Sequence, residues 1–176
     1  MIGPRADTAP PGEPLLICSH SAAETQRIGE ALGAALRSAP DAQTASTVVT
    51  LAGPLGGGKT CLMQGLARGL GVGGAVRSPT FTLIHEHRGP VLLQHVDLYR
   101  IAAGDLEALG LDEIIDRRGV TAIEWGDRAE SLVPPEHLRI ELQFGRDACD
   151  RWVRMIPRGR RYEQLLAALR ACASWR

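Results

Sequence analysis

The chain has 176 residues, which is the size of one domain large enough to bury a hydrophobic core. Hydrophobic residues make up 44% of it and charged residues 23%, and its acidic and basic residues balance at twenty each. This composition is typical of a globular protein, and the zero net charge argues against a protein that holds nucleic acid by bulk electrostatic attraction. Because no apolar run approaches the ~20 residues that cross a bilayer, we expect no contact with a membrane.

Residues 1–14 are rich in proline and carry no apolar signal-peptide core. We therefore expect a disordered N-terminal extension, followed by a single folded domain over residues 15–176. The four cysteines form neither a CxxC pair nor a framework of short loops. This pattern indicates free thiols and a cytoplasmic protein.

Apolar and β-branched runs alternate with segments of helical periodicity. Ser21 and Glu24 form a capping-box pattern that opens the first helix, and Gly71 ends the second. Strands are expected at residues 15–18, 47–52, 81–86, 91–97, 120–124, 138–144 and 152–156. Further helices are expected at residues 105–109 and 112–117 and from Tyr162 to Leu169. This order predicts an α/β sandwich of three layers with a mixed, partly parallel sheet.

Residues 53–60 read GPLGGGKT and match the phosphate-loop pattern G-x-x-x-x-G-K-[ST]. A buried strand precedes them and a helix follows, so the predicted fold is that of a P-loop NTPase. The glycines let successive backbone N–H groups face one anion, and the helix adds its positive N-terminal end. The predicted nucleotide-binding positions of the loop are Gly56, Gly57, Gly58, Lys59, Thr60 and Cys61.

Lys59 is the only lysine of the sequence, and it would reach the β- and γ-phosphates of ATP. The Thr60 hydroxyl would bind Mg²⁺. A P-loop enzyme also needs a carboxylate near the metal. Asp97 and Glu124 each end a predicted strand, and ligands bind at the carboxyl ends of strands in open α/β sheets. Both strands are expected to flank the strand before the loop, so at least one of these acids is expected in the site.

Other polar segments are open to two interpretations. Residues 78–82 read SPTFT and form either a switch-like loop near the γ-phosphate or the start of a strand. His85 and His87 alternate on a predicted strand, which indicates a solvated face more often than a metal site. Arginines near the C-terminus indicate a solvated surface, with contact to RNA or an acidic partner as the alternative. They are Arg146, Arg151, Arg154, Arg158, Arg160 and Arg161.

Five motifs occur along the chain in the order GPLGGGKT, SPTFTL, HVDLYR, LGLDEII and IEWGD. Their order and spacing resemble the TsaE (YjeE) family, the ATPase component of bacterial threonylcarbamoyladenosine biosynthesis on tRNA. The resemblance covers about residues 15–156, and its specificity comes from the motifs beyond the P-loop. It implies a Mg²⁺-dependent ATPase that works with TsaD-like and TsaB-like proteins and contacts tRNA only indirectly.

The resemblance also implies roles for individual residues. Asp97 and Lys59 would be catalytic, Asp97 being needed for hydrolysis. Glu124 would bind Mg²⁺ together with the threonine of the P-loop. Trp125 falls on a functionally sensitive tryptophan of the family, and Thr25 falls near the side of the adenine pocket.

Two positions depart from the family pattern. Pro54 stands where the family generally has an acid, which puts in question any role of that acid in catalysis or switching. Cys61 stands where a second threonine is common. This change should matter less, because the main contribution of the residue is a backbone N–H to the α-phosphate.

Two other functions also fit the loop. A small-molecule kinase would need an acceptor pocket and an arginine-rich lid, and it leaves the DLYR and IEW segments unexplained. A nucleotide-binding adaptor without significant hydrolysis is separated from an ATPase by a single-turnover measurement. A GTPase is disfavoured because its guanine-reading NKxD motif requires asparagine, which the sequence lacks. Arg77 and Arg100 lie beside the right motifs to act as an arginine finger in cis, but neither can be assigned.

Overall fold

The computed structural model describes residues 12–74, 76, 79, 83–101 and 110–172. Its strands are β1 (Leu15–Ser19), β2 (Ser46–Ala52), β3 (Ile84–His87), β4 (Leu93–Asp97), β5 (Gly119–Glu124), β6 (His137–Phe144) and β7 (Arg151–Arg158). Its helices are α1 (Ala22–Arg37), α2 (Lys59–Gly69), α3 (Leu111–Ile115), the 3-10 helix η3 (Gly126–Ala129) and α4 (Arg160–Cys172). Within these ranges no helix is long and apolar enough to span a bilayer. The greater part of the predicted extension, residues 1–11, and the predicted helix at 105–109 lie outside the described residues.

The strands form one sheet in the order β1-β7-β6-β2-β5-β4-β3. Strand β2 pairs in parallel with both β5 and β6, and β4 pairs in parallel with β5. The pairs β1–β7, β6–β7 and β3–β4 are antiparallel. The predicted α/β fold with a mixed, partly parallel sheet is therefore confirmed.

The predicted placement of the two acid-bearing strands is wrong in one respect. Strand β5, which ends at Glu124, lies next to β2 as expected, but β4, which ends at Asp97, lies one strand further out. The other side of β2 is taken by β6, which pairs with β2 from Val49 to Ala52. Asp97 and Glu124 are nevertheless register partners, so both acids end their strands at the same level of the sheet.

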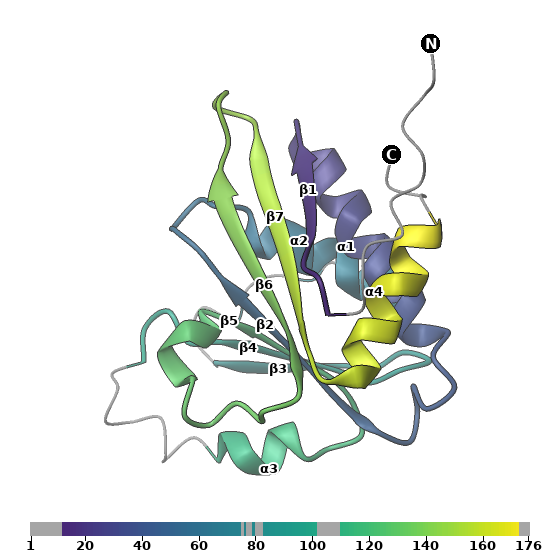
Figure 1. The fold of residues 1–176 in the computed structure, drawn as a ribbon. Coiled ribbons are helices and arrows are strands. Elements are labelled where there is room, and N and C mark those ends of the chain that lie inside the picture. The colour runs from purple at the N-terminus through teal and green to yellow at the C-terminus, as the bar shows by residue number, and fades with distance from the viewer. Residues whose placement is uncertain (1–11, 75, 77–78, 80–82, 102–109, 173–176) are drawn as a thin grey trace.

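Helices cover both faces of the sheet. Leu51 of β2 lies in a core with Leu66 of α2 and Leu166 of α4. Val48 of β2 points to the opposite face and lies in a second core with Ile114 of α3. Figure 1 shows α1, α2 and α4 gathered on one side and α3 apart from them. All residues of β2 except Ser46 are buried, as expected for a strand that is covered on both faces, and this confirms the three-layer arrangement.

Helix α1 begins at its predicted cap, with one difference from a capping box. The Ser21 hydroxyl accepts a hydrogen bond from the backbone N–H of Glu24 at 3.1 Å. The Glu24 carboxylate accepts one from the backbone N–H of His20 at 2.7 Å, whereas a capping box would use the N–H of Ser21. Both contacts fix the point at which the chain leaves β1 and enters α1.

Four glycines bring α1 and α2 into backbone contact. A Cβ atom at Gly29 or Gly33 of α1 would lie 2.1 or 2.2 Å from a carbonyl oxygen of α2. A Cβ atom at Gly65 or Gly69 of α2 would lie 2.0 or 2.1 Å from a carbonyl oxygen of α1. These positions have no room for a side chain, so the helix that follows the phosphate loop is held tightly against α1.

We predict that Gly65→Ala destabilises the protein by about 1–3 kcal/mol, because the added methyl group forces the two helices apart. In a helix without this contact the same change would stabilise by about 0.5–1 kcal/mol, so the sign of the effect is itself the test. The measurement is urea denaturation. Gly73→Ala is the control, because a Cβ atom there meets nothing within 4 Å. A stabilising effect of Gly65→Ala would contradict the close packing.

Candidate active site

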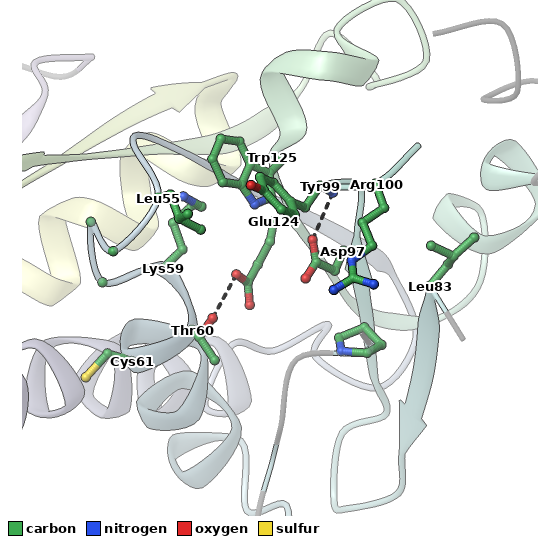
Figure 2. Close-up of a pocket in the computed structure, with 14 residues that line it drawn as sticks. Leu55, Lys59, Thr60, Cys61, Leu83, Asp97, Tyr99, Arg100, Glu124 and Trp125 are labelled. Carbon is green, nitrogen blue, oxygen red and sulfur yellow. Dashed lines mark hydrogen bonds between the residues drawn. The ribbon is translucent and has the colours of Figure 1, made fainter. Parts of the chain in front are cut away.

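The phosphate loop joins the end of β2 to the start of α2 and lines a pocket of about 330 Å³. Gly58 is the N-cap residue of α2 with a φ of 99°, a conformation that favours glycine. The first backbone N–H groups of a helix have no partner within the helix, so they present positive charge to this pocket. Figure 2 shows Lys59, Asp97 and Glu124 arranged around the same space.

The side chain of Lys59 bonds back to the start of the phosphate loop. Its ammonium donates to the carbonyl oxygens of Gly53 at 2.7 Å and Pro54 at 2.9 Å. The same Nζ atom lies 3.6 Å from the ring centroid of Trp125, a cation–π contact. Burial lowers the pKa of Lys59, and the negative charge of Glu124 opposes this shift. An incoming anion would strengthen the charged form, so Lys59 is well placed to bind phosphate.

Thr60 and Glu124 supply an oxygen pair that suits Mg²⁺. The Thr60 hydroxyl donates to Oε2 of Glu124 at 3.1 Å, and Glu124 is only 2% exposed. Mg²⁺ prefers oxygen ligands in octahedral geometry with bonds of about 2.0–2.1 Å, which places adjacent ligands about 2.9 Å apart. The spacing and chemistry of these two oxygens therefore fit the predicted metal site.

The other oxygen of Glu124 is bound by His95, a residue to which the sequence assigns no role. His95 is fully buried on β4, and its Nε2 lies 3.0 Å from Oε1 of Glu124. An ionised carboxylate only accepts hydrogen bonds, so Nε2 carries the proton. A signal was present in the sequence: His95 interrupts an apolar strand two residues before Asp97, and alternation places both on one face.

The histidines of β3 form the next layer around His95. The rings of His87 and His95 lie 6.3 Å apart, and Nε2 of His87 and Nδ1 of His95 are buried without a hydrogen-bond partner in the described part of the chain. Burial lowers the pKa of His87, and the nearby His95 and His85 lower it further. His85 and His87 are only partly exposed, so the predicted solvated face is partly wrong. Their proximity to His95 could not be read from the sequence.

Asp97 lies at the opposite edge of the pocket from the loop. It is more exposed than Glu124, and its Oδ1 accepts the backbone N–H of Tyr99 at 3.0 Å. Arg100 also lines the pocket, and Figure 2 shows its guanidinium on the same side as Asp97. The structure therefore brings together Lys59 and both predicted acids.

Trp125 forms the upper wall of the pocket in Figure 2. It follows Glu124 directly and has a φ of 62°, a left-handed conformation that is strained for a bulky residue. Its ring lies 4.9 Å from that of Tyr99 and covers the ammonium of Lys59. The backbone turn at this point places the ring over the loop, and a role of Trp125 in nucleotide binding stays a prediction.

Thr25 is beside the loop but does not line the pocket. It is buried at the start of α1, its hydroxyl shares a 2.8 Å hydrogen bond with that of Ser19, and its methyl group lies near Gly58. Cys61 lines the pocket, and its thiol donates to the carbonyl of Ala22 at 3.2 Å. Burial raises the pKa of the Cys61 thiol. Thr25 therefore supports the loop, and contact with adenine stays a prediction.

The predicted arginine surface near the C-terminus is partly engaged within the protein. Arg151 donates to the carbonyl of Gly56 in the phosphate loop at 3.2 Å, a role that no sequence pattern indicated. Arg154 pairs with Glu141, and Arg161 pairs with Asp41. Most of the predicted switch-like segment, together with Arg77, lies outside the described residues. Its one described residue, Pro79, lines the pocket.

A glycine loop joins a buried parallel strand to a helix, ends in lysine and threonine, and faces an acid on the neighbouring strand. This combination defines the chain as an α/β protein of the P-loop class. The family model described as "Threonylcarbamoyl adenosine biosynthesis protein TsaE" matches residues 19–152. The chain therefore belongs to the TsaE family, which confirms the resemblance that its motifs indicated.

Individual relatives agree with the family model. The tRNA threonylcarbamoyladenosine biosynthesis protein TsaE of Bacillus subtilis is 42% identical over 123 residues, which is 69% of this chain and 77% of the relative. The protein of the same name from Treponema pallidum is 40% identical over 126 residues, covering 71% and 88%. The crystal structure of YdiB from Bacillus subtilis matches with a TM-score of 0.74 at 32% identity, covering 91% of this chain and 96% of YdiB.

We predict that His95→Leu destabilises the protein by about 1–3 kcal/mol, because it leaves one oxygen of a buried carboxylate without its donor. Gln94→Leu is the matched control: Gln94 is equally buried on the same strand, but it contacts Thr121 and not Glu124. Denaturant unfolding of both variants measures the difference. Equal loss of stability in the two variants would show that the contact between His95 and Glu124 is unimportant.

Proposed function

We propose that the chain is a Mg²⁺-dependent ATPase that supports the threonylcarbamoyladenosine modification of tRNA as one part of a multi-protein complex. One arrangement carries the proposal: Lys59, Thr60 and Glu124 meet at the phosphate loop, with Asp97 across the pocket. The names of the family and of its relatives support the pathway.

Phosphate binding uses the loop and the start of α2. The N–H groups from Gly56 to Cys61 and the positive end of the helix attract the anion. Lys59 exchanges the carbonyl oxygens of Gly53 and Pro54 for phosphate oxygens. This exchange is favourable because a hydrogen bond between two charged groups is stronger than one to a neutral carbonyl. It also withdraws the ammonium from the ring of Trp125.

Thr60 and Glu124 would hold Mg²⁺, which, when bound, neutralises charge that develops on the phosphates. His95 fixes the Glu124 carboxylate, so the metal ligand is already oriented before the ion arrives. Asp97 orients the attacking water and accepts its proton. Its greater exposure supports this division, because a water molecule reaches Asp97 more easily than the buried Glu124.

Substitution of Glu124 and substitution of Asp97 are expected to cause different defects in hydrolysis. Glu124→Gln should raise the Mg²⁺ concentration needed for half-maximal hydrolysis about tenfold or more, since changes around a metal site typically cost 10–100-fold in affinity, while ATP still binds without Mg²⁺. Asp97→Asn should retain ATP and Mg²⁺ but slow a single turnover by about 10²–10⁴, the range expected for loss of general-base catalysis. Calorimetry and rapid quenching measure the two effects. Identical defects in both variants would show that this division of roles is wrong.

We further expect slow hydrolysis by the chain alone and at least a tenfold increase when TsaD-like and TsaB-like proteins are added. The transition state needs charge compensation that partner arginines often supply in trans. Steady-state assays with and without the partners measure this. Fast turnover without stimulation would indicate a self-sufficient enzyme, with Arg100 as the candidate finger in cis. Absence of turnover under all conditions would instead favour a nucleotide-binding adaptor.

A further inference from the structure

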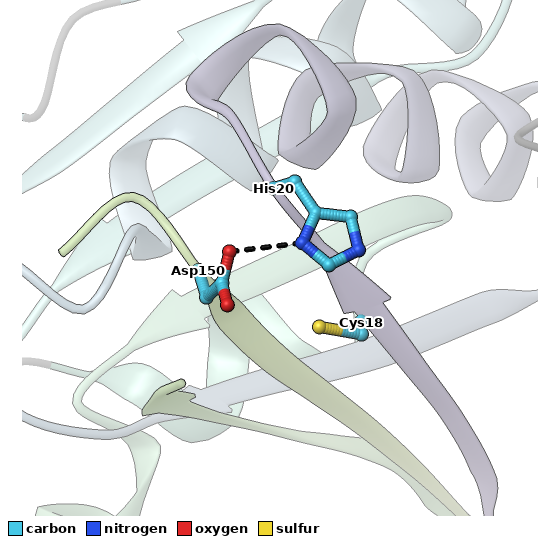
Figure 3. A group of neighbouring side chains, drawn as sticks. All are labelled: Cys18, His20 and Asp150. Atoms are coloured by element: carbon cyan, nitrogen blue, oxygen red, sulfur yellow. Dashed lines mark hydrogen bonds and ion pairs between the residues drawn. The ribbon is translucent and has the colours of Figure 1, made fainter. Parts of the chain in front are cut away.

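A second polar group lies where β1 ends and β7 begins. Ser19, the last residue of β1, is the register partner of Arg151, the first residue of β7. His20 follows Ser19 and Asp150 precedes Arg151, so these two residues lie opposite each other just beyond the paired strands. Cys18 lies near the end of β1, and His20 is the first residue after the strand. Figure 3 shows Cys18, His20 and Asp150 pointing toward one another.

The three side chains are close enough to share one ion. One ligand atom of each lies within 4.8 Å of the others, and Nδ1 of His20 lies 2.9 Å from Oδ1 of Asp150. A tetrahedral zinc site has bonds of about 2.0–2.3 Å, so its ligand atoms are about 3.3–3.8 Å apart. Asp150 is 8% exposed, and the backbone N–H of Asp147 donates to its second oxygen at 3.3 Å. Tetrahedral coordination would need His20 to move slightly away from this carboxylate, and any pair of ligand atoms that is further apart than about 3.8 Å to come closer together.

The electrostatic surroundings favour a positive charge at this point. The hydrogen bond and the charge of Asp150 raise the pKa of His20, and the charge of Glu24 raises it further. The pKa of the Cys18 thiol is raised by burial and then by Asp150 and Glu24. The Cys18 thiol and the His20 imidazole therefore hold their protons more tightly than usual. A metal ion would displace these protons, as metal ions do at other sites built from thiolate and imidazole.

We propose a binding site for a divalent transition-metal ion, with Zn²⁺ as the preferred ion, formed by Cys18, His20 and Asp150. A thiolate, an imidazole and a carboxylate are the ligand types that zinc uses, whereas Mg²⁺ prefers oxygen alone. Water completes the coordination, because three protein ligands leave the fourth position open. This site is separate from the oxygen pair of Thr60 and Glu124, and the proposal does not depend on ATP hydrolysis.

A metal ion bound by Cys18, His20 and Asp150 would affect the phosphate loop through two sets of contacts. Asp150 precedes Arg151, whose guanidinium donates to the carbonyl of Gly56. On the other side, Ser19 shares a hydrogen bond with Thr25, whose methyl group lies near Gly58. An ion bound between β1 and β7 therefore fixes both segments that support the loop, although it touches no residue of the nucleotide pocket.

The test is titration of the full chain with Zn²⁺ by calorimetry and with Co²⁺ by absorbance, in buffer that contains excess Mg²⁺. We expect one ion per chain and a sulfur-to-cobalt charge-transfer band. Cys18→Ser should abolish the band, and His20→Ala should weaken binding at least about tenfold, since even partners outside the ligand shell contribute 10–100-fold.

Cys61→Ser is the control for loss of a thiol outside the proposed site, and Cys61 is partly buried like Cys18. His137→Ala is the control for loss of an imidazole outside the site. Both controls should bind Zn²⁺ like the natural sequence. Unfolding curves show whether each variant is folded. The proposal is overturned if binding does not saturate at one ion, if Cys18→Ser binds as tightly as the natural sequence, or if excess Mg²⁺ displaces the ion.

Discussion

The buried carboxylate of Glu124 is held between two donors from different parts of the chain, and the rest of the site depends on this contact. Thr60 at the start of α2 donates to one oxygen, and His95 on β4 donates to the other. A buried charge is costly unless it is hydrogen-bonded, so β4, β5 and α2 must keep their relative positions. The parallel register of β4 and β5 brings Asp97 to the same level. The hydrogen-bonded carboxylate of Glu124 thus fixes the positions of the phosphate loop and of Asp97 relative to each other.

In the proposed function, Lys59 is the part of this arrangement that moves. Its contacts with Gly53, Pro54 and Trp125 stay within the loop and its wall, whereas Glu124 is anchored in the sheet. In the proposed cycle the lysine moves to the phosphates while the metal ligand stays in place. The close packing of α1 on α2 limits movement of the helix itself. Nucleotide binding is therefore expected to change side-chain contacts around a fixed scaffold.

The sequence predicted the parts of the site that local chemistry determines. The P-loop has its own pattern, and acids at strand ends are recognisable, so Asp97 and Glu124 were both identified. The position of β4 beside β2 was predicted wrongly, whereas that of β5 was right, because apolar runs show that a strand is buried but not which strand lies beside it. His95 was missed for a related reason: its partner is 29 residues away and lies on another strand. The contact between His20 and Asp150 spans 130 residues and leaves no local pattern.

A crystal structure with Mg²⁺ and a non-hydrolysable ATP analogue tests the central claim most directly. The account predicts Nζ of Lys59 on the β- and γ-phosphates, away from the carbonyl oxygens of Gly53 and Pro54. It also predicts Mg²⁺ on the Thr60 hydroxyl, with Glu124 bound to the ion directly or through one water molecule. Nucleotide bound elsewhere, with Lys59 still beneath Trp125, would contradict the account.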